Sequence, residues 1–389
     1  MGKEFHPVIV VAAYNRPLSL TRILGSLRNA RFKEDATLII SIDNDEPNNL
    51  DVKSIAEQFH WPHGPKEVRY QDKHLGLRRH ILQCGDLSME YGSVIIFEDD
   101  LYVSPYFYEY ALEALEFYSY DHQIGGVSLF NQPVEEITEY PFSAINDHSD
   151  VYFIQFPSSL GQAWTRAQWK EFRDWYDSEP DLSISGIPDR ILKWPASSWK
   201  KYFCAFLVEK NKFFVFPRVS FSTNFNDPGT NLKKPINHEG QTPLRLFGQP
   251  YRFRKIADSF SIYDIHLELV SECIGKLSSH LNEYAYELDL YGTKDLNKVK
   301  HPFLITSRPS AHPVLGFKRA LKPHEMNIIL NLEGKDFALT RVEDVMPITN
   351  KYERIISNYI YFYSRHILGW KTQIYCYFTK IKNIILRRK

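Results

Sequence analysis

The chain has 389 residues, of which 43% are hydrophobic and 24% are charged, so it can bury a sizeable core in one large domain or in two unequal ones. Lysine plus arginine and aspartate plus glutamate number 47 each, which argues against a chain-wide attraction to nucleic acid. The four cysteines lack CxxC spacing, which argues against a zinc site or a disulfide framework. No apolar leader precedes the first apolar stretch, and together these features indicate a reducing cytosol.

Hydrophobic patterns in the first third alternate between strands and helices, which is typical of a parallel sheet with crossover helices. A continuous apolar stretch is followed by Pro17, which suits a first helical turn, and by leucines and isoleucines at helical spacing. The expected strands are 8–13, 37–42 and 93–97, and the expected helices are one that begins at Pro17, 51–59, 75–87 and one from 104–105 to about 118.

Each of the three strands ends in a polar cluster, with sequences YNRP (14–17), DND (43–45) and EDD (98–100). In open α/β sheets, ligands bind outside the carboxyl ends of the strands. We therefore expect the three clusters to converge on one binding site.

The pattern loosens after the first third of the chain. Further helices are expected at 168–176, 199–210 and 264–281, and a small α/β appendage at 301–339. A long mobile loop is expected at 224–249, and loops of that length are usually functional lids or disordered segments. The helical spacing of the tryptophans favours packing in the core over a surface platform that would bind the acceptor. The predicted divisions are a catalytic domain at 1–260, an accessory α/β region at 261–345 and a basic aromatic helical tail at 346–389. Two interpretations of the tail stay open: it binds an anionic membrane surface, or it docks on the body.

The acids Glu98, Asp99 and Asp100 follow directly on an apolar strand. Adjacent carboxylates at the end of a buried strand are costly unless a counter-charge arrives, and a divalent cation such as Mn²⁺ or Mg²⁺ supplies one. Such cations keep open positions for water and substrate phosphates, so one or two carboxylates suffice. In an extended chain Asp99 and Asp100 would point to opposite sides, which predicts a single direct ligand.

These stretches resemble, in order, the GT-A nucleotide-sugar glycosyltransferases, and the EDD form resembles the N-acetylglucosaminyltransferase I family. The matching segments between about 6 and 250 are VIVVAAYNRPLSLTRILGSL, SIDND, HLGLRRHILQ, FEDDLYVSPYFYEYALEAL, ILKWPASSWKKYF and FPRVSFSTNF with a glycine-containing loop after it. The segment GQAWTRAQWKEFRDWY is also similar to bacterial glycosyltransferases that build surface polysaccharides.

The resemblance implies a mixed, mostly parallel sheet flanked by helices, a UDP-sugar donor and Mn²⁺ or Mg²⁺. It implies Asp100 as metal ligand, Asp99 as ribose contact and Glu98 as a supporting catalytic acid. The implied nucleotide-site residues are Ala13, Tyr14 and Arg16 in the pocket, Asp43 on the uracil imide, His74, Arg78 or Arg79 on the diphosphate, and Gly229 and Thr230 in a lid.

One departure concerns the general base. Where the family has W-D-D-W, this sequence has Trp199, Lys200, Lys201 and Tyr202. An inverting transfer needs a carboxylate that takes the proton of the acceptor hydroxyl. Asp189 is the expected substitute, and the further candidates are Asp177, Asp181 and Asp227.

Three functional hypotheses remain. The first is a metal-dependent inverting glycosyltransferase that moves a sugar from a UDP-sugar to a hydroxyl of a growing surface glycan. Its acceptor would be a glycan or lipid-linked glycan, and it would act in the cytoplasm, peripheral to the inner face of a membrane. The second is a sugar-phosphate nucleotidyltransferase, although YNRPLSL lacks the expected glycine-rich basic loop. The third is a non-catalytic nucleotide-sugar-binding protein. The absence of HExxH, GxGxxG and GxxxxGK[ST] patterns disfavours zinc hydrolases, dinucleotide oxidoreductases and P-loop enzymes.

Overall fold

The computed structural model describes residues 6–184, 186–225, 227 and 241–347, together with positions 358, 361, 362, 374 and 378. The described strands are β1 (Val8–Ala13), β2 (Leu38–Ile42), β3 (Lys66–Tyr70), β4 (Ser93–Glu98), β5 (Leu101–Val103), β6 (Ile124–Ser128), β7 (Val151–Ile154), β8 (Gln162–Thr165), β9 (Phe213–Pro217), β10 (Ser222–Asn224), β11 (Ile262–Tyr263), β12 (Tyr286–Asp289), β13 (Phe303–Thr306), β14 (Leu315–Phe317) and β15 (Phe337–Arg341). The described α-helices are α1 (Pro17–Arg28), α2 (Leu50–Gln58), α3 (Gly76–Tyr91), α4 (Phe107–Phe117), α5 (Arg166–Tyr176), α6 (Asp189–Leu192), α7 (Trp199–Glu209), α8 (Ser271–Leu277) and α9 (Glu325–Ile329).

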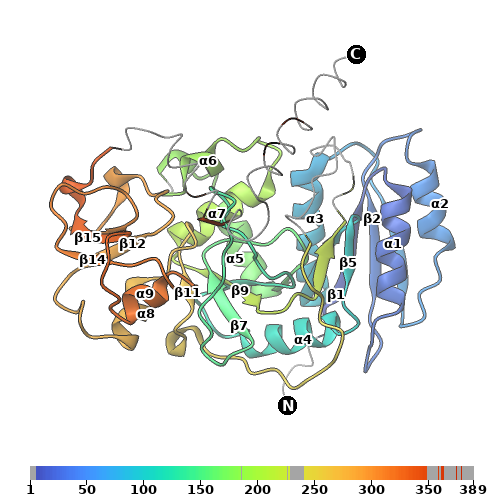
Figure 1. The fold of residues 1–389 in the computed structure, drawn as a ribbon. Coiled ribbons are helices and arrows are strands. Elements are labelled where there is room, and N and C mark those ends of the chain that lie inside the picture. The colour runs from blue at the N-terminus through green and yellow to red at the C-terminus, as the bar shows by residue number, and fades with distance from the viewer. Residues whose placement is uncertain are drawn as a thin grey trace.

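A large mixed sheet forms the centre of the molecule, with strand order β11-β7-β9-β6-β8-β4-β1-β2-β3 (Figure 1). The pairs β4–β1, β1–β2, β2–β3, β6–β9 and β11–β7 are parallel, whereas β4–β8, β6–β8 and β7–β9 are antiparallel. The expected mixed, mostly parallel α/β sheet with flanking helices is confirmed. The strands expected at 8–13, 37–42 and 93–97 also form, each within one residue of its predicted ends.

Helices cover both faces of this sheet. Successive residues of β1 point to opposite faces, so Val8 and Val10 join the core with α3, α5 and α7, whereas Ile9 and Val11 join the core with α1, α2 and α4. The tryptophans at 164, 169, 175 and 199 are buried in the first of these cores. The expectation that they pack in the core is therefore confirmed.

A separate four-stranded sheet, in the order β12-β13-β15-β14, forms the C-terminal appendage. It lies at the end of the molecule opposite α1 and α2 (Figure 1). Its first strand begins at Tyr286, so the appendage starts earlier than the expected range 301–339. The strand β11 pairs with β7 of the large sheet, and the division predicted at residue 260 stays a prediction.

The prediction of one helix over 264–281 is wrong, because α8 is the only helix that forms in this range. The carboxylate of Asp264 accepts hydrogen bonds from the backbone N–H groups of His266 at 2.8 Å and Glu268 at 3.0 Å. Leu267 between them has a φ of 55°, outside the helical region. Side-chain bonding of this kind competes with helix formation and holds the segment in a turn.

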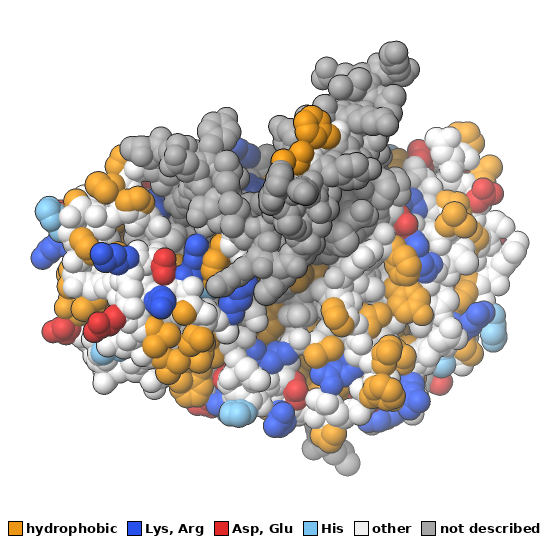
Figure 2. All heavy atoms as spheres, in the orientation of Figure 1, with side chains coloured by type: hydrophobic (Ala, Val, Ile, Leu, Met, Phe, Trp, Pro, Cys, Tyr) orange, Lys and Arg blue, Asp and Glu red, His pale blue; other side chains and the backbone are white. Residues whose placement is uncertain are grey.

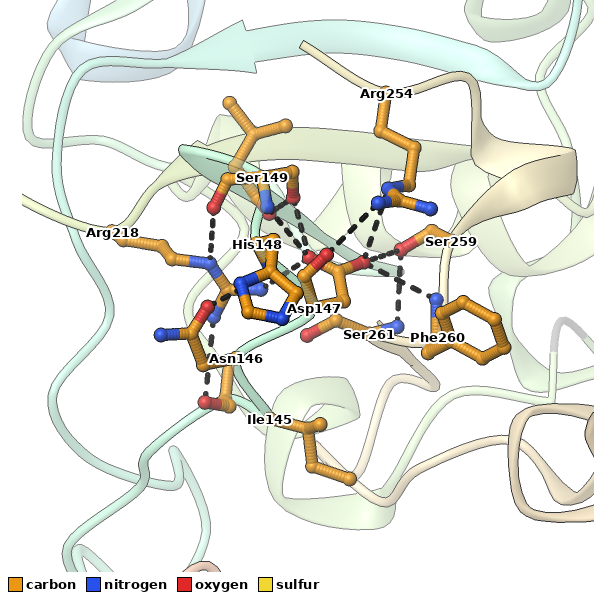
Figure 3. A network of polar contacts seen from close by, with 12 residues as sticks. Ile145, Asn146, Asp147, His148, Ser149, Arg218, Arg254, Ser259, Phe260 and Ser261 are labelled. Carbon is orange, nitrogen blue, oxygen red and sulfur yellow. Dashed lines mark hydrogen bonds and ion pairs between the residues drawn. The ribbon is translucent and has the colours of Figure 1, made fainter. Parts of the chain in front are cut away.

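A buried carboxylate, Asp147, ties the segment before β7 to two distant parts of the chain (Figure 3). Its Oδ1 accepts from Arg218 Nη2 at 3.0 Å and from Ser149 Oγ at 2.6 Å. Its Oδ2 accepts from Ser259 Oγ at 2.9 Å and lies 3.8 Å from Arg254 Nε. The network joins β9 to the segment that leads into β11, because Arg218 follows β9 directly and Ser259 precedes β11.

On the face drawn in Figure 2, basic, acidic and hydrophobic side chains are interspersed over the part that is coloured by side-chain type. Within the described residues, no helix is both long and apolar enough to cross a bilayer. The described cysteines, Cys84, Cys204 and Cys273, are free and buried. The predicted tail at 346–389 lies almost entirely outside the described residues.

Candidate functional site

The three polar clusters meet at one edge of the sheet, as the sequence predicts. In the parallel register, Ala12 of β1 lies opposite Ser41 of β2 and opposite Glu98 of β4. The backbone N–H of Asp43 then donates to the carbonyl of Ala13 at 3.0 Å. Because these strands end at the same level, the residues that follow them share one space.

That space is a cavity of about 480 Å³. Its lining comes from all three clusters, from the start of α3, from the segment before α7 and from the end of β10. The lining residues are Ala12, Ala13, Tyr14, Asn15, Arg16, Asp43, His74, Gly76, Leu77, His80, Ile81, Glu98, Asp99, Asp100, Ser197, Asn224 and Asp227. We call it the donor cavity.

Arg16 binds both aspartates of the EDD cluster. Its Nη1 donates to Asp100 Oδ2 at 2.9 Å, and its Nη2 donates to Asp99 Oδ1. The two aspartates lie in the turn between β4 and β5, so their carboxylates converge on one guanidinium. The expectation that they point to opposite sides is wrong, because the chain turns at this point instead of remaining extended.

Burial makes the charged forms of two of the acids unfavourable. Burial, reinforced by the charge of Asp100, raises the pKa of Glu98 to about 8, although Arg16 opposes the rise. Burial also raises the pKa of Asp99 to about 6, again against the opposing charge of Arg16. Both carboxyl groups therefore favour their neutral forms more than free carboxyl groups do.

The chemistry of this cluster fits a hard divalent cation. Among the described residues, Asp99 Oδ2 is buried and has no hydrogen-bond partner, although it belongs to a carboxylate that lines the cavity. An unpartnered buried oxygen of this kind is costly and is suited to a metal or to a donor on a ligand. The described residues offer no cluster of three or more His, Cys, Asp or Glu ligands, so a cation here would take one or two carboxylates and complete its shell with phosphate oxygens and water.

Asp43 is held by the start of α3. Its carboxylate accepts from the backbone N–H groups of Asn44 at 2.9 Å, Leu75 at 2.8 Å and Gly76 at 2.9 Å, and its Oδ2 lies 3.1 Å from His74 Nδ1. These bonds satisfy N–H groups that a helix start leaves without partners. Its role toward a uracil imide stays a prediction, because the four contacts already occupy the usual acceptor positions of a carboxylate.

Two aromatic rings lie beside Asp43 at the rim. The rings of Tyr14 and His74 are 5.2 Å apart with a 37° angle between their planes. Both residues line the donor cavity, and the His74 side chain is 59% exposed. The rim therefore offers flat surfaces to a ring-shaped ligand.

Several expected residues lie outside the donor cavity. Arg78 donates to the Tyr202 hydroxyl at 2.6 Å, and Arg79 is exposed on α3. Asp189 is exposed on α6 and lies 3.4 Å from Lys298 Nζ. Asp177 and Asp181 are likewise absent from the cavity wall, and Gly229 and Thr230 lie outside the described residues.

Asp227, the remaining candidate, lines the cavity. Its carboxylate accepts from Ser19 Oγ at 2.8 Å and from Arg22 Nη2, so it ties the segment after β10 to α1. Eight wall residues were not assigned to the site from the sequence: Ala12, Asn15, Gly76, Leu77, His80, Ile81, Ser197 and Asn224. Two of them carried a signal, because Asn15 lies in the YNRP cluster and Asn224 begins the loop expected at 224–249.

No protein-family model matches this chain, and a comparison with curated proteins found no match. Among solved structures, it is similar to mannosyltransferase PcManGT from Pyrobaculum calidifontis in complex with GDP-Man and Mn²⁺, at 12% identity and a TM-score of 0.29, over 42% of this chain and 46% of that one. It is also similar to S. aureus TarS 1–349, at 11% identity and a TM-score of 0.35, over 56% of this chain and 59% of that one. A third similar structure is GalNAc-T7 with UDP, GalNAc and Mn²⁺, at 12% identity and a TM-score of 0.37, over 56% and 43% of the two chains. The chain thus spans about half the length of these structures, and likenesses this weak say nothing of its own donor, metal or acceptor.

Proposed function

We propose that this protein is a metal-dependent inverting glycosyltransferase that moves a sugar from a UDP-sugar to a hydroxyl group of a glycan or lipid-linked glycan. The observation that carries the proposal is the convergence of Asp99, Asp100 and Arg16 in one cavity with Asp43 and an aromatic rim. Carboxylates beside a guanidinium suit a metal–diphosphate, and flat rings suit a nucleobase.

We expect the nucleotide-sugar to bind in the donor cavity in one orientation. Tyr14 and His74 would face the base, Asp99 the ribose and Arg16 the diphosphate. Arg16 is 23% exposed on its side chain, so its guanidinium can reach phosphate oxygens as well as the two aspartates. The sugar would then lie near Asn224 and Ser197, which also line the cavity.

Asp100 would hold Mn²⁺ or Mg²⁺, and the unpartnered oxygen of Asp99 would accept a hydrogen bond from the ribose. Such an ion, when bound, neutralises charge that develops on the leaving diphosphate. Arg16 would stabilise the same charge by donating to phosphate oxygens, and Glu98 would support the site from the end of β4.

We also propose a cytoplasmic site of action at the inner face of a membrane, where lipid-linked acceptors are found. Free, buried thiols at the three described cysteines support a reducing compartment. The basic tail would supply the attraction to anionic lipid. Sedimentation with acidic liposomes tests this location, since removal of residues 350–389 should abolish binding.

UDP release tests the proposed activity. The protein is incubated with UDP-glucose, UDP-galactose or UDP-N-acetylglucosamine, with and without Mn²⁺. Slow Mn²⁺-dependent release of UDP from one donor, lost in Asp100→Ala, is the expected result. Pyrophosphate formation from UTP and a sugar phosphate would instead favour a nucleotidyltransferase, and binding of UDP-sugars without turnover would favour a binding protein.

A further inference from the structure

A second cavity, of about 380 Å³, adjoins the donor cavity. We propose that this second cavity binds the hydroxyl-bearing acceptor and that Glu136 on its wall takes the acceptor's proton, an inference that rests on the proposed glycosyl transfer. The wall comes from the turn after β6, the segment before β8, α6, the start of α7 and the end of β10. We call it the acceptor cavity.

Asn224 links the two cavities, because it belongs to the wall of both. It pairs with Leu101 in the β10–β5 ribbon, directly after the EDD cluster. The next residue, Phe225, donates its backbone N–H to the carbonyl of Asp100 at 3.4 Å. The acceptor cavity therefore opens at the Asp100 end of the donor cavity, where a sugar that follows the diphosphate would lie.

Glu136 stands on a turn that is fixed by its neighbours. The buried carboxylate of Glu135 accepts from the backbone N–H of Ile137 at 2.9 Å, and from the backbone N–H and the hydroxyl of Thr138, both at 2.6 Å. Arg190 of α6 donates to Glu139 at 2.6 Å. This bonding gives the cavity wall a set geometry before any ligand arrives, as catalysis by positioning requires.

Glu136 also differs from its neighbour Glu139 in what holds it. Within the described residues, no hydrogen-bond donor contacts the Glu136 carboxylate, and its nearest charged partner is Lys200 Nζ at 3.9 Å. Glu139 is engaged by Arg190, and Asp189 points to Lys298 at the surface. Glu136 is thus the wall carboxylate that is most available to accept a proton.

Lys200 stands where the resemblance implies a catalytic acid. It occupies the start of α7, in the W-K-K-Y segment where the resemblance leads one to expect an acid. Its Nζ lies 4.1 Å from the ring centre of Phe156 and 3.9 Å from the Glu136 carboxylate. Glu136 comes from the turn after β6, so the carboxylate beside Lys200 belongs to another part of the chain.

The proposed step is balanced. The acceptor hydroxyl oxygen forms a bond to the anomeric carbon while the bond from that carbon to the phosphate oxygen breaks. The electron pair of the broken bond leaves with UDP, and the hydroxyl proton passes to a Glu136 carboxylate oxygen. Attack from the acceptor cavity, on the side opposite the diphosphate, inverts the anomeric configuration.

The wall also indicates what the acceptor is made of. Its two acids lie beside two bases, as Glu136–Lys200 and Glu139–Arg190, so the cavity has no strong net charge. Amide and hydroxyl side chains, including Gln132 and Asn224, offer both donors and acceptors. A neutral polyhydroxylated acceptor fits this wall better than an anionic one.

Water as acceptor gives the simplest test. UDP release from the active UDP-sugar with Mn²⁺ is measured for the wild type, Glu136→Gln, Glu136→Asp, the rival Asp189→Asn, and Glu116→Gln as an exposed glutamate on α4. UDP–Mn²⁺ affinity is measured by calorimetry for each. Glu136→Gln should lower the release rate by about 100-fold or more while UDP affinity changes less than about twofold, because only the proton acceptor is lost. Glu136→Asp should recover part of the rate, and Glu116→Gln should match the wild type.

The outcomes separate the inference from the function on which it rests. A full rate in Glu136→Gln, or a loss confined to Asp189→Asn, overturns the assignment of Glu136 and leaves glycosyl transfer standing. Absence of UDP binding or release in the wild type overturns the proposed function and the inference together. Loss of UDP affinity in Glu136→Gln also overturns the assignment, because it would show that Glu136 serves the donor cavity.

Discussion

Arg16 Nη1 lies 2.9 Å from Asp100 Oδ2, although 84 positions separate the two residues in the chain. The parallel pairing of β1 with β4 brings the ends of both strands together, so Arg16 after β1 lies beside the acids at the end of β4. One guanidinium thus compensates two carboxylates. A divalent cation bound at Asp100 would take over part of that compensation, and Arg16 could then turn to the diphosphate.

We therefore expect Arg16→Gln to be less stable than the wild type by about 2 kcal/mol without metal, because Asp99 and Asp100 lose a charged hydrogen-bond donor. Added Mn²⁺ should raise the melting temperature of this variant more than that of the wild type. Thermal unfolding with and without Mn²⁺ measures both. Arg28→Gln, at an exposed arginine of the same helix, is the control, and an equal Mn²⁺ response in all three proteins would contradict the account.

Asp100→Asn should lower the affinity for UDP in the presence of Mn²⁺ by at least about tenfold, because a neutral amide is a poor ligand for a hard cation. The affinity for UDP without Mn²⁺ should change little. Calorimetric titration with UDP, with and without the ion, makes the comparison. Asp51→Asn, at an exposed acid of α2, should behave as the wild type, and unchanged Mn²⁺ dependence in Asp100→Asn would remove Asp100 from the metal site.

His80 predicts an acid sensitivity. Burial lowers the pKa of His80 from 6.5 to about 4, so the native imidazole stays neutral while the unfolded chain takes up a proton near pH 6.5. The unfolded state then binds more protons between pH 6.5 and 4, and the free energy of unfolding falls as pH falls through that window, by roughly 3 kcal/mol. His80→Gln can keep the bond to Ser41 and cannot titrate. Urea unfolding from pH 7.5 to 4.5 should give a shallower fall in the variant, and equal slopes would refute the buried neutral histidine.

Asp147→Asn should destabilise the fold by about 3 kcal/mol or more at pH 7, because it leaves Arg218 and Arg254 beside a neutral amide. Although burial opposes it, hydrogen bonds from Ser149 and Ser259 and the charge of Arg218 lower the pKa of Asp147 below 3.8. Its stabilisation is therefore present above pH 3.8 and is lost as pH falls through the lower native value. Urea unfolding should show a large loss in the free energy of unfolding relative to the wild type at pH 7 and a smaller loss at pH 3.

The matched control for this network is Asp174→Asn, because Asp174 is 64% exposed and pairs with Lys170 on the surface of α5. Exposed pairs of this kind contribute little. A loss of stability in Asp174→Asn equal to that in Asp147→Asn would show that burial of the carboxylate is not what matters.

The sequence predicted the first half of the site well because local signals set it. Continuous apolar runs gave β1, β2 and β4, and polar residues directly after them had to share an edge once the strands were parallel. The turn at Asp99 and Asp100 could not be foreseen, because alternation assumes a chain that stays extended. The helix predicted after Asp264 was wrong for a similar reason. The Asp264 side chain accepts hydrogen bonds from the backbone and so prevents the helix from forming there.

The acceptor side was beyond reach from sequence alone. Its wall joins a turn at Glu136, a helix start at Lys200 and a strand end at Asn224, which lie far apart in the chain and share no spacing. The resemblance implies an acid next to Trp199, where the chain has Lys200, and Asp189 is the substitute expected from the sequence. The carboxylate beside Lys200 belongs to another element of the fold. Only the fold brings that pair together.

A crystal structure with UDP and Mn²⁺, with anomalous diffraction at the manganese edge, would show whether the donor cavity holds the metal and the diphosphate. We expect one manganese peak bound by the Asp100 carboxylate and by diphosphate oxygens, with the base beside Tyr14 and His74. Manganese or UDP bound elsewhere, with Arg16 still closed on Asp99 and Asp100, would contradict this expectation.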